Sequence, residues 1–331
     1  MTMTHIEVYK SVNRWLTKLR AKSRSLDFSK SSTKRAGIYW LKRYCKYLKT
    51  NPDTLLNERM KNLESKSELV RRKHEEHVEE FSIMLESKEY APHKKYAPNT
   101  IATAIGMIRS FYKSNYAPLI EVSTIRPYNI RPFKVPTLKE LKKICKKAEL
   151  PIKSWILSQK DSGLANIDLI DLKLTNLSSE YGTIKSQLKK GIVPVHIEVR
   201  RQKTGERTHS FFGPNSIDAL NEYVDLNKRG RIFKMSVRTI QENVKSTAIR
   251  ARVATKDVPV TPYSFRKFFN TQMKFAGMNE SLVEVMMGHS IGRVRSAYLV
   301  TGRGGVGSGI PISRLAEEYM KYYHAIDITK A

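Results

Sequence analysis

Three polar side chains near the carboxyl end of the chain have the types and spacing needed to cut a phosphodiester bond without a metal. Arg266 falls in the first turns of a predicted helix, His289 follows a second predicted helix, and Tyr298 stands nine residues after His289. A tyrosine hydroxyl can act as the nucleophile at phosphorus, while neighbouring cations neutralise the charge on the phosphate oxygens. The pattern therefore predicts Tyr298 as a nucleophile, with Arg266 and His289 binding the phosphate.

Two short helices must hold these side chains in place. Thr261 can cap the first helix and Pro262 can occupy its first position. An apolar stripe then follows at helical spacing, formed by Phe265, Phe268, Phe269 and Met273. Gly277 is placed to end this helix and Asn279 to cap the next one.

The charge of the chain indicates a polyanionic partner. Its 331 residues include 60 Lys and Arg against 31 Asp and Glu, a net charge of +29, and 40% are hydrophobic. A nucleic acid explains such a surplus better than a membrane surface does. No apolar run approaches the ~18 residues of a spanning helix, so we expect no membrane insertion. With a nucleic acid as the partner, we expect no small-molecule substrate.

The cysteines and histidines do not predict a metal site. Cys45 and Cys145 lie 100 residues apart and neither belongs to a CxxC pair. His74 and His77 have helical spacing but lack an evident third ligand. We expect a reducing, intracellular setting, in the cytoplasm and associated with the nucleoid.

Composition divides the chain into five parts. Most of it reads as helix, and residues 191–212 read as a β-hairpin with Lys203 at its tip, so the predicted class is mainly α with a small antiparallel β-sheet. The predicted parts are a basic N-terminal helical extension (1–30), a helical DNA-binding domain (31–117), a proline-interrupted linker (118–136), a catalytic domain (137–301), and a glycine-rich tether with a C-terminal helix (302–331).

For the predicted helices at the two ends of the chain, the sequence does not decide between two packing partners. Residues 4–20 form an amphipathic basic helix that either lies on DNA or a partner, or packs on the next domain. The last helix, residues 312–326, either docks on its own domain or on a neighbouring subunit.

Basic residues on the helices of the first domain are candidates for phosphate contacts. They are Lys34, Arg35, Lys42, Arg43, Lys94, Lys95, Arg109 and Lys113.

Several motifs together resemble the tyrosine recombinase family, and its archaeal integrases in particular. The segments STKRAGIYWLKRYCKYL and YAPNTIATAIGMIRSFY are similar to the family's SAM-like core-binding domain, and VPTLKELKKI to the opening of its catalytic domain. The most specific match is RKFF with MMGHS and a tyrosine nine residues beyond that histidine. The resemblance covers most of residues 31–326 and implies the family's DNA breaking-rejoining fold.

The resemblance assigns roles to the matching residues. Tyr298 matches the nucleophile that forms a 3′-phosphotyrosyl link, Arg266 the second catalytic arginine, and His289 the late histidine. Lys203 matches the lysine that protonates the leaving 5′ oxygen, and Tyr263 stands where the family usually has a histidine. The family works without metal or cofactor, as a homotetramer on double-stranded DNA.

One departure from the family pattern affects catalysis. The first catalytic arginine normally follows Gly-Leu, but this chain has SGLANIDL, which places Ala165 there. Losing one such group commonly costs about 2.7–4 kcal/mol of transition-state stabilisation. Three nearby cations are candidates to replace it: Lys160, Arg200 and Arg201. The predicted function is thus a site-specific recombinase or integrase, and the alternative is a weak or inactive DNA-binding protein that retains the fold.

Overall fold

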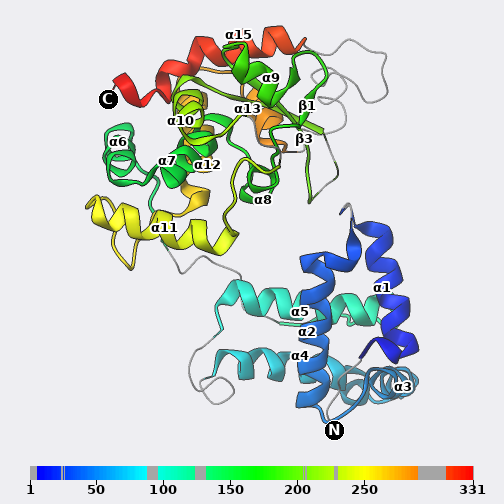
Figure 1. Cartoon of the computed structure of the whole chain (residues 1–331). Helices are drawn as coiled ribbons and strands as arrows, with labels where there is room; N and C mark the ends of the chain where they lie inside the picture. The colour runs from blue at the N-terminus through cyan, green and yellow to red at the C-terminus, as the bar shows by residue number, and fades with distance from the viewer. Residues whose placement is uncertain are drawn as a thin grey trace. The chain divides into compact units, whose positions relative to one another are not determined.

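The computed structural model divides the chain into two compact units, Met1–Ile130 and Arg131–Ala331 (Figure 1). The structure describes residues 6–23, 25, 27–87, 96–123, 132–203, 205, 207–226, 230–289 and 311–330. Its described part is mainly helical with two small antiparallel sheets, which confirms the predicted fold class.

The first unit is built from helices packed around one aromatic-rich core. Its helices are α1 (Lys10–Lys22), α2 (Ser32–Tyr47), α3 (Pro52–Leu63), α4 (Glu68–Glu86) and α5 (Pro98–Ser114), with 3-10 turns η1 (Ile6–Val8) and η2 (Phe28–Lys30). Side chains such as Trp15, Tyr44, Phe81 and Phe111 are fully buried there. Residues 55–85 divide between α3 and α4.

Helix α1 belongs to this core. The Trp15 indole is buried, donates to the Ser110 hydroxyl at 3.1 Å and meets the Phe111 ring edge-on. A Cβ atom on Gly37 would lie 2.8 Å from the Trp15 ring, so this glycine lets α1 and α2 approach closely. Of the two interpretations of residues 4–20, the structure has the packed helix.

A buried ion pair joins three segments of the first unit. The Arg59 guanidinium lies 2.6 Å from the Glu75 carboxylate and also donates to the Pro118 carbonyl at 2.9 Å. Both side chains are almost fully buried. Removing one partner of such a pair leaves an uncompensated charge, which typically costs about 3–5 kcal/mol.

The second unit surrounds a larger core. Its helices are α6 (Leu138–Lys147), α7 (Leu150–Ser162), α8 (Asn166–Ile170), α9 (Ile184–Lys189), α10 (Pro214–Tyr223), α11 (Val237–Arg250), α12 (Pro262–Phe275), α13 (Glu280–Met287) and α15 (Ile312–Tyr322), followed by turns η3 (Tyr323–Ala325) and η4 (Ile328–Lys330). Thr137 and Glu140 form a capping box at the start of α6, as the sequence indicates.

The predicted hairpin is present as two strands. Strand β3 (Val195–Arg200) pairs antiparallel with β4 (Arg207–Phe212), with Val195 opposite Phe212 and Arg200 opposite Arg207. A second small sheet pairs β1 (Leu177–Ser178) with β2 (Gly182–Thr183).

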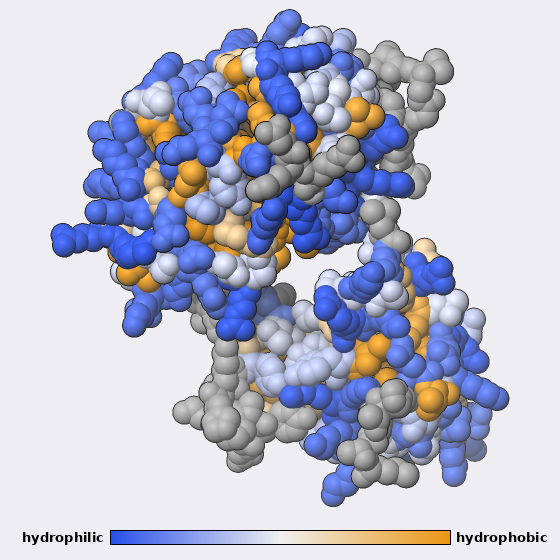
Figure 2. All heavy atoms as spheres, viewed as in Figure 1, coloured by the Kyte–Doolittle hydropathy of each residue, from blue (hydrophilic) through white to orange (hydrophobic). Residues whose placement is uncertain are grey.

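The visible faces of both units are largely hydrophilic, with smaller apolar areas between the polar side chains (Figure 2). Among the helices that the structure describes, none is both long and apolar enough to cross a membrane.

A buried histidine pair in the hairpin predicts acid sensitivity. His196 stacks on His209, with ring centroids 5.3 Å apart, and contacts the Ser178 hydroxyl at 2.6 Å. Burial lowers the pKa of His196 to about 4, and it lowers the pKa of His209 as well. Both imidazoles are therefore neutral in the folded chain at neutral pH.

We predict that the free energy of unfolding falls as the pH drops from 7 to 5. The unfolded chain binds more protons in this window, because its histidines titrate near 6.5 and the folded His196 only near 4. His196 alone contributes about 2 kcal/mol to this loss. Urea denaturation at both pH values should show a smaller difference for His196→Gln than for wild type. The exposed control His324→Gln should keep the wild-type difference, and equal pH dependence in all three proteins would contradict the prediction.

Candidate active site

Arg266 reaches the interior of the second unit from the second turn of α12. The helix begins after Thr261, whose backbone N–H donates to the Ser264 hydroxyl at 3.0 Å. Phe265, Phe268 and Phe269 are fully buried and fix the rotation of the helix. Arg266 is itself only 5% exposed, because its neighbours on the same face anchor α12 in the core.

The buried guanidinium of Arg266 donates to neutral acceptors. Nη1 donates to the Gly163 carbonyl, and Nη2 donates to the Met287 carbonyl at 2.8 Å and to His289 Nε2 at 2.7 Å. Within the described residues, Arg266 has no carboxylate at ion-pair distance. A buried cation without an anionic partner is costly, which marks the place where an anionic ligand would be bound.

Gly163 supplies one of these acceptors, and no other residue type fits at its position. It ends α7 with a φ of 61°, in the left-handed region that favours glycine. A Cβ atom there would lie 2.3 Å from the Phe269 ring, so any side chain would displace α12 as well. The Gly163 carbonyl is thereby held against Arg266.

His289 follows α13, where Gly288 ends the helix in the left-handed conformation. An arginine can only donate, so His289 Nε2 must accept from Arg266, and the ring proton lies on Nδ1. Nδ1–H then donates to the Glu284 carboxylate, which also accepts from Lys274 Nζ at 2.6 Å. Glu284 therefore fixes the tautomer and orientation of the imidazole.

The surrounding charges perturb the two ionised groups next to His289. Burial, the largest cause, and the positive charge of Arg201 together lower the pKa of Arg266 to about 10, against the opposing effect of Asp168. Burial raises the pKa of Glu284, but hydrogen bonds from Lys274 and His289 outweigh it, so the pKa lies below its usual value. Both groups are charged at neutral pH.

The three cations considered as replacements at Ala165 occupy different places. Arg201 is 8% exposed and its Nε lies 3.2 Å from Asp168, whereas Arg200 is exposed and donates to the Gly205 carbonyl at 2.9 Å. Lys160 is fully buried and pairs with the adjacent Asp161.

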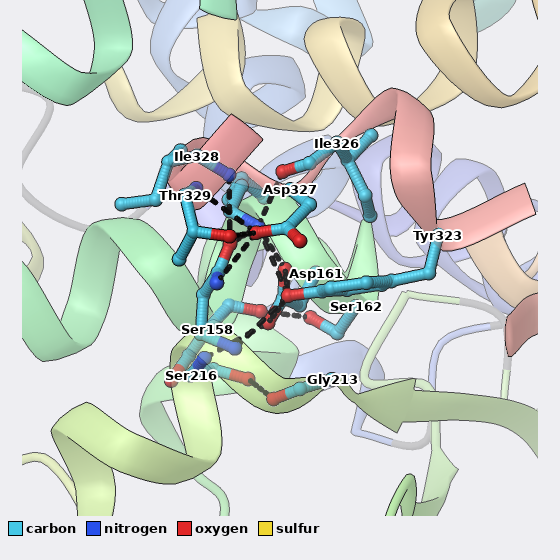
Figure 3. A network of polar contacts seen from close by, with 12 residues as sticks. Ser158, Asp161, Ser162, Gly213, Ser216, Tyr323, Ile326, Asp327, Ile328 and Thr329 are labelled. Atoms are coloured by element: carbon cyan, nitrogen blue, oxygen red, sulfur yellow. Dashed lines mark hydrogen bonds and ion pairs between the residues drawn. The ribbon is translucent and has the colours of Figure 1, made fainter. Parts of the chain in front are cut away.

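Lys160 is part of a network that holds the C-terminal segment. Its Nζ also donates to Asn215 Oδ1 at 2.8 Å and to the Ile326 carbonyl at 2.7 Å. Figure 3 shows the Tyr323 hydroxyl pointing toward Asp161, to which it donates at 3.2 Å. All these acceptors belong to the fold, so Lys160 is not available to bind a phosphate.

The C-terminal helix packs on its own unit. Ile312, Leu315 and Tyr319 of α15 are buried in the core of the second unit, and Tyr319 donates to the Asp161 carbonyl at 3.1 Å. Of the two dockings considered for this helix, the structure has the one on its own domain.

Within the described part of the chain, no hydrogen bond joins the remaining predicted catalytic residues to the Arg266–His289 pair. Lys203 is exposed in the turn between β3 and β4, two residues beyond Arg201. Tyr263 is 56% exposed on the first turn of α12, and its ring meets the edge of Phe133. Tyr298 lies outside the described residues.

Six of the eight basic residues proposed to contact DNA lie on two helices of the first unit. On α5, Arg109 and Lys113 are exposed and one turn apart. On α2, Arg35 is exposed, while the ammonium of Lys34 lies 2.7 Å from Glu7.

The other members of this basic set have different surroundings. Lys42 is half-buried, and the Arg43 guanidinium lies over the Tyr39 ring, 4.7 Å from its centroid, and donates to the Tyr96 hydroxyl. Lys94 and Lys95 lie outside the described residues.

Two site residues were not anticipated from the sequence. Asp168 accepts from Arg201 Nε and from the Gln202 backbone N–H at 3.0 Å, and Glu284 orients His289. Asp168 lies three residues after Ala165, and Glu284 lies five residues before His289. These spacings alone do not predict that Asp168 binds Arg201 or that Glu284 binds His289.

The model of the phage integrase family matches residues 132–300, just over half of the sequence. The chain therefore belongs to the phage integrase family of tyrosine recombinases. No curated protein sequence matches it.

Solved structures share the fold. The XerH site-specific recombinase bound to its difH substrate is 15% identical, with a TM-score of 0.51 over 88% of this chain and 91% of that chain. The Tn1549 transposon integrase in complex with circular intermediate DNA is 14% identical, with a TM-score of 0.51 over 89% of this chain and 96% of that chain.

We predict that His289 carries its proton on Nδ1 and that Glu284 is the reason. In Glu284→Gln the amide can donate to Nδ1, so the preference for this tautomer should weaken. Nitrogen-15 NMR of the histidine side chains reports the protonated ring nitrogen directly. The control Glu280→Gln changes an exposed carboxylate at the start of α13 and should leave the His289 signals unchanged. A wild-type His289 protonated on Nε2 would contradict the assignment.

Proposed function

We propose that this chain is a site-specific DNA recombinase that cuts and rejoins DNA through a 3′-phosphotyrosyl intermediate at Tyr298. The observation that carries the proposal is the buried Arg266 guanidinium, bonded to His289 and lacking a carboxylate partner in the described residues. Such a pair suits a phosphate, whose oxygens accept from the remaining N–H groups. Membership of the phage integrase family supports the same reaction.

In the proposed first step, the Tyr298 hydroxyl releases its proton to water, and its oxygen attacks the scissile phosphorus and forms a P–O bond. The bond from phosphorus to the 5′ oxygen breaks, and that oxygen takes a proton from Lys203. Arg266 neutralises the charge that grows on the non-bridging oxygens, and His289 holds the Arg266 guanidinium in position through Nε2. Tyr263 donates a hydrogen bond beside them.

In the second step, the 5′ hydroxyl of a partner strand attacks the phosphotyrosine. The attacking hydroxyl returns a proton to Lys203, and a new P–O bond replaces the bond to Tyr298, whose oxygen recovers a proton from water. The number of phosphodiester bonds is unchanged, so the exchange requires neither a nucleotide nor an external energy source. No metal takes part in either step.

The proposed partner is double-stranded DNA in the cytoplasm, at the nucleoid, bound by a homotetramer. XerH and the Tn1549 integrase are described in complexes with DNA. We extend that partner to this chain, whose net charge of +29 suits it. The exposed basic residues of α2 and α5 would contact the phosphates.

A second candidate function follows from Ala165. An alanine cannot bind a phosphate oxygen, and without a substitute the chain would bind DNA and cut it slowly or not at all. A third hypothesis is a generic basic nucleic-acid-binding protein, for which the spacing of Arg266, His289 and Tyr298 has no significance. It would gain if these side chains diverged, whereas Arg266 and His289 are hydrogen-bonded.

We predict that Tyr298→Phe abolishes a covalent DNA adduct. Duplexes that the protein binds would first be selected from a random pool and then remade with a nick near each central base. After cleavage beside the nick, the short 5′-hydroxyl fragment dissociates, so the strand cannot be rejoined and the adduct accumulates. Denaturing electrophoresis measures the adduct, which wild type should form. Tyr181→Phe removes a hydroxyl elsewhere in the same unit and should leave it unchanged.

Two outcomes would contradict the recombinase. An adduct that persists in Tyr298→Phe would exclude this tyrosine as the nucleophile. Sequence-selective binding by wild type without an adduct on any nicked duplex would favour the non-catalytic DNA-binding protein.

We also predict that Arg109 and Lys113 contact phosphates. In the double alanine variant, the slope of log affinity for DNA against log salt concentration should be less steep by about 2, or roughly one unit for each lost phosphate contact. Fluorescence anisotropy at several salt concentrations measures the slope. Lys61→Ala removes an exposed charge from α3 and is the control. An unchanged slope in the double variant would place the DNA elsewhere.

A further inference from the structure

Of the three candidates to replace the arginine missing at Ala165, Arg201 is the one whose surroundings join it to the Arg266–His289 pair. The residue directly follows strand β3, yet only 8% of it is exposed, whereas its neighbour Arg200 faces solvent. A buried arginine next to a hairpin turn is unusual, since arginine is almost never fully buried without a partner. Its partners therefore indicate what it is for.

Arg201 is anchored to the helix that begins where the family arginine is missing. Its Nε lies 3.2 Å from Asp168 on α8, and α8 starts directly after Ala165. The other oxygen of Asp168 accepts from the backbone N–H of Gln202 at 3.0 Å. Asp168 thus holds both the side chain of Arg201 and the backbone that follows it.

The second anchor of Arg201 adjoins the binding site of Arg266. Arg201 Nη1 donates to the Gly288 carbonyl, and Arg266 Nη2 donates to the carbonyl of the preceding residue, Met287. The guanidinium groups therefore bind consecutive carbonyls just before His289. Their mutual repulsion is consistent with the lowered pKa of Arg266.

Gly288 is shaped to admit Arg201. Its φ of 66° lies in the left-handed region, and a Cβ atom there would lie 2.5 Å from Arg201 Cδ and 2.4 Å from the Thr208 hydroxyl. Any other residue would push the Arg201 side chain away. The end of α13 thus accommodates the arginine and the histidine together.

From this geometry we propose that Arg201 is a phosphate-binding catalytic residue that replaces the arginine absent at Ala165. The inference rests on the proposed function, because it names a further residue of the same site. Within the described residues, Arg201 Nη2 makes no hydrogen bond, so this group can donate to a non-bridging oxygen. Arg266 would contact the phosphate from α12 and Arg201 from the hairpin that also carries Lys203.

The charge balance of the site supports the assignment. Lys274 offsets Glu284 and Arg201 offsets Asp168, so the charge of Arg266 remains unmatched among these groups. A phosphodiester carries one negative charge and gains a second as the nucleophile attacks. A second guanidinium is useful at that stage, because it matches the charge that develops in the transition state.

The test compares Arg201→Ala with the matched control Arg200→Ala on two nicked duplexes. One duplex has an ordinary scissile phosphate, and the other has a methylphosphonate there, in which a methyl group replaces one charged oxygen. We expect Arg201→Ala to form the Tyr298 adduct about 100- to 1000-fold more slowly than wild type on the phosphate. On the neutral methylphosphonate its deficit should shrink at least tenfold, since less charge has to be neutralised. Arg200→Ala should match wild type on both.

A merely structural role for Arg201 gives a different result. Loss of folding or of DNA binding would slow both substrates equally, so an equal deficit on both duplexes overturns the inference. Thermal unfolding and DNA affinity are measured on the same samples, and Arg201→Lys, which keeps a charge beside Asp168, provides a second variant. Arg201→Lys should fall between wild type and Arg201→Ala on the phosphate duplex.

The inference and the proposed function fail in distinguishable ways. If wild type forms an adduct and Arg201→Ala forms it at the rate of Arg200→Ala, the inference alone is wrong. If wild type forms no adduct on either duplex, the recombinase itself is wrong and the inference falls with it.

Discussion

The buried positive charge of Arg266 constrains the elements packed around it. Its N–H groups require acceptors, and they find them at the end of α7, at the end of α13 and on His289. Each acceptor depends on local chemistry: a left-handed Gly163 that faces Phe269, and a Glu284 that fixes the imidazole proton. The guanidinium thereby joins the end of α7, which lies 103 residues away in the sequence, to the neighbouring helices α12 and α13.

Two buried cations in this unit differ in how their charge is balanced. Lys160 meets a carboxylate, an amide oxygen and a carbonyl, so its charge is used within the fold to hold the C-terminal segment. Arg266 meets only neutral acceptors among the described residues, which leaves its charge for an external anion. Burial alone therefore does not distinguish the two cations: the ammonium of Lys160 is saturated within the fold, whereas the charge of Arg266 is left without a balancing carboxylate.

Local patterns predicted much of the fold. The capping residues Thr137 and Asn279, the apolar stripe of α12 and the alternation in the hairpin each follow from neighbours in the sequence. The spacing from Arg266 to His289 predicted a shared site, and the two side chains do meet. Strands of two residues, such as β1, are too short to show an alternating hydrophobic pattern. The amphipathic pattern of α1 predicts a helix with one apolar face, but it does not identify the surface against which that face packs.

Long-range partners could not be predicted in this way. Lys160 and Ile326 are 166 residues apart, and Arg201 and Gly288 are 87 apart, so no periodicity links them. The most direct test is a crystal structure of the chain trapped covalently on a nicked duplex. It should show the phosphorus bonded to Tyr298, with its non-bridging oxygens accepting from Arg266 and Arg201. A phosphate bound away from Arg266 would contradict the account.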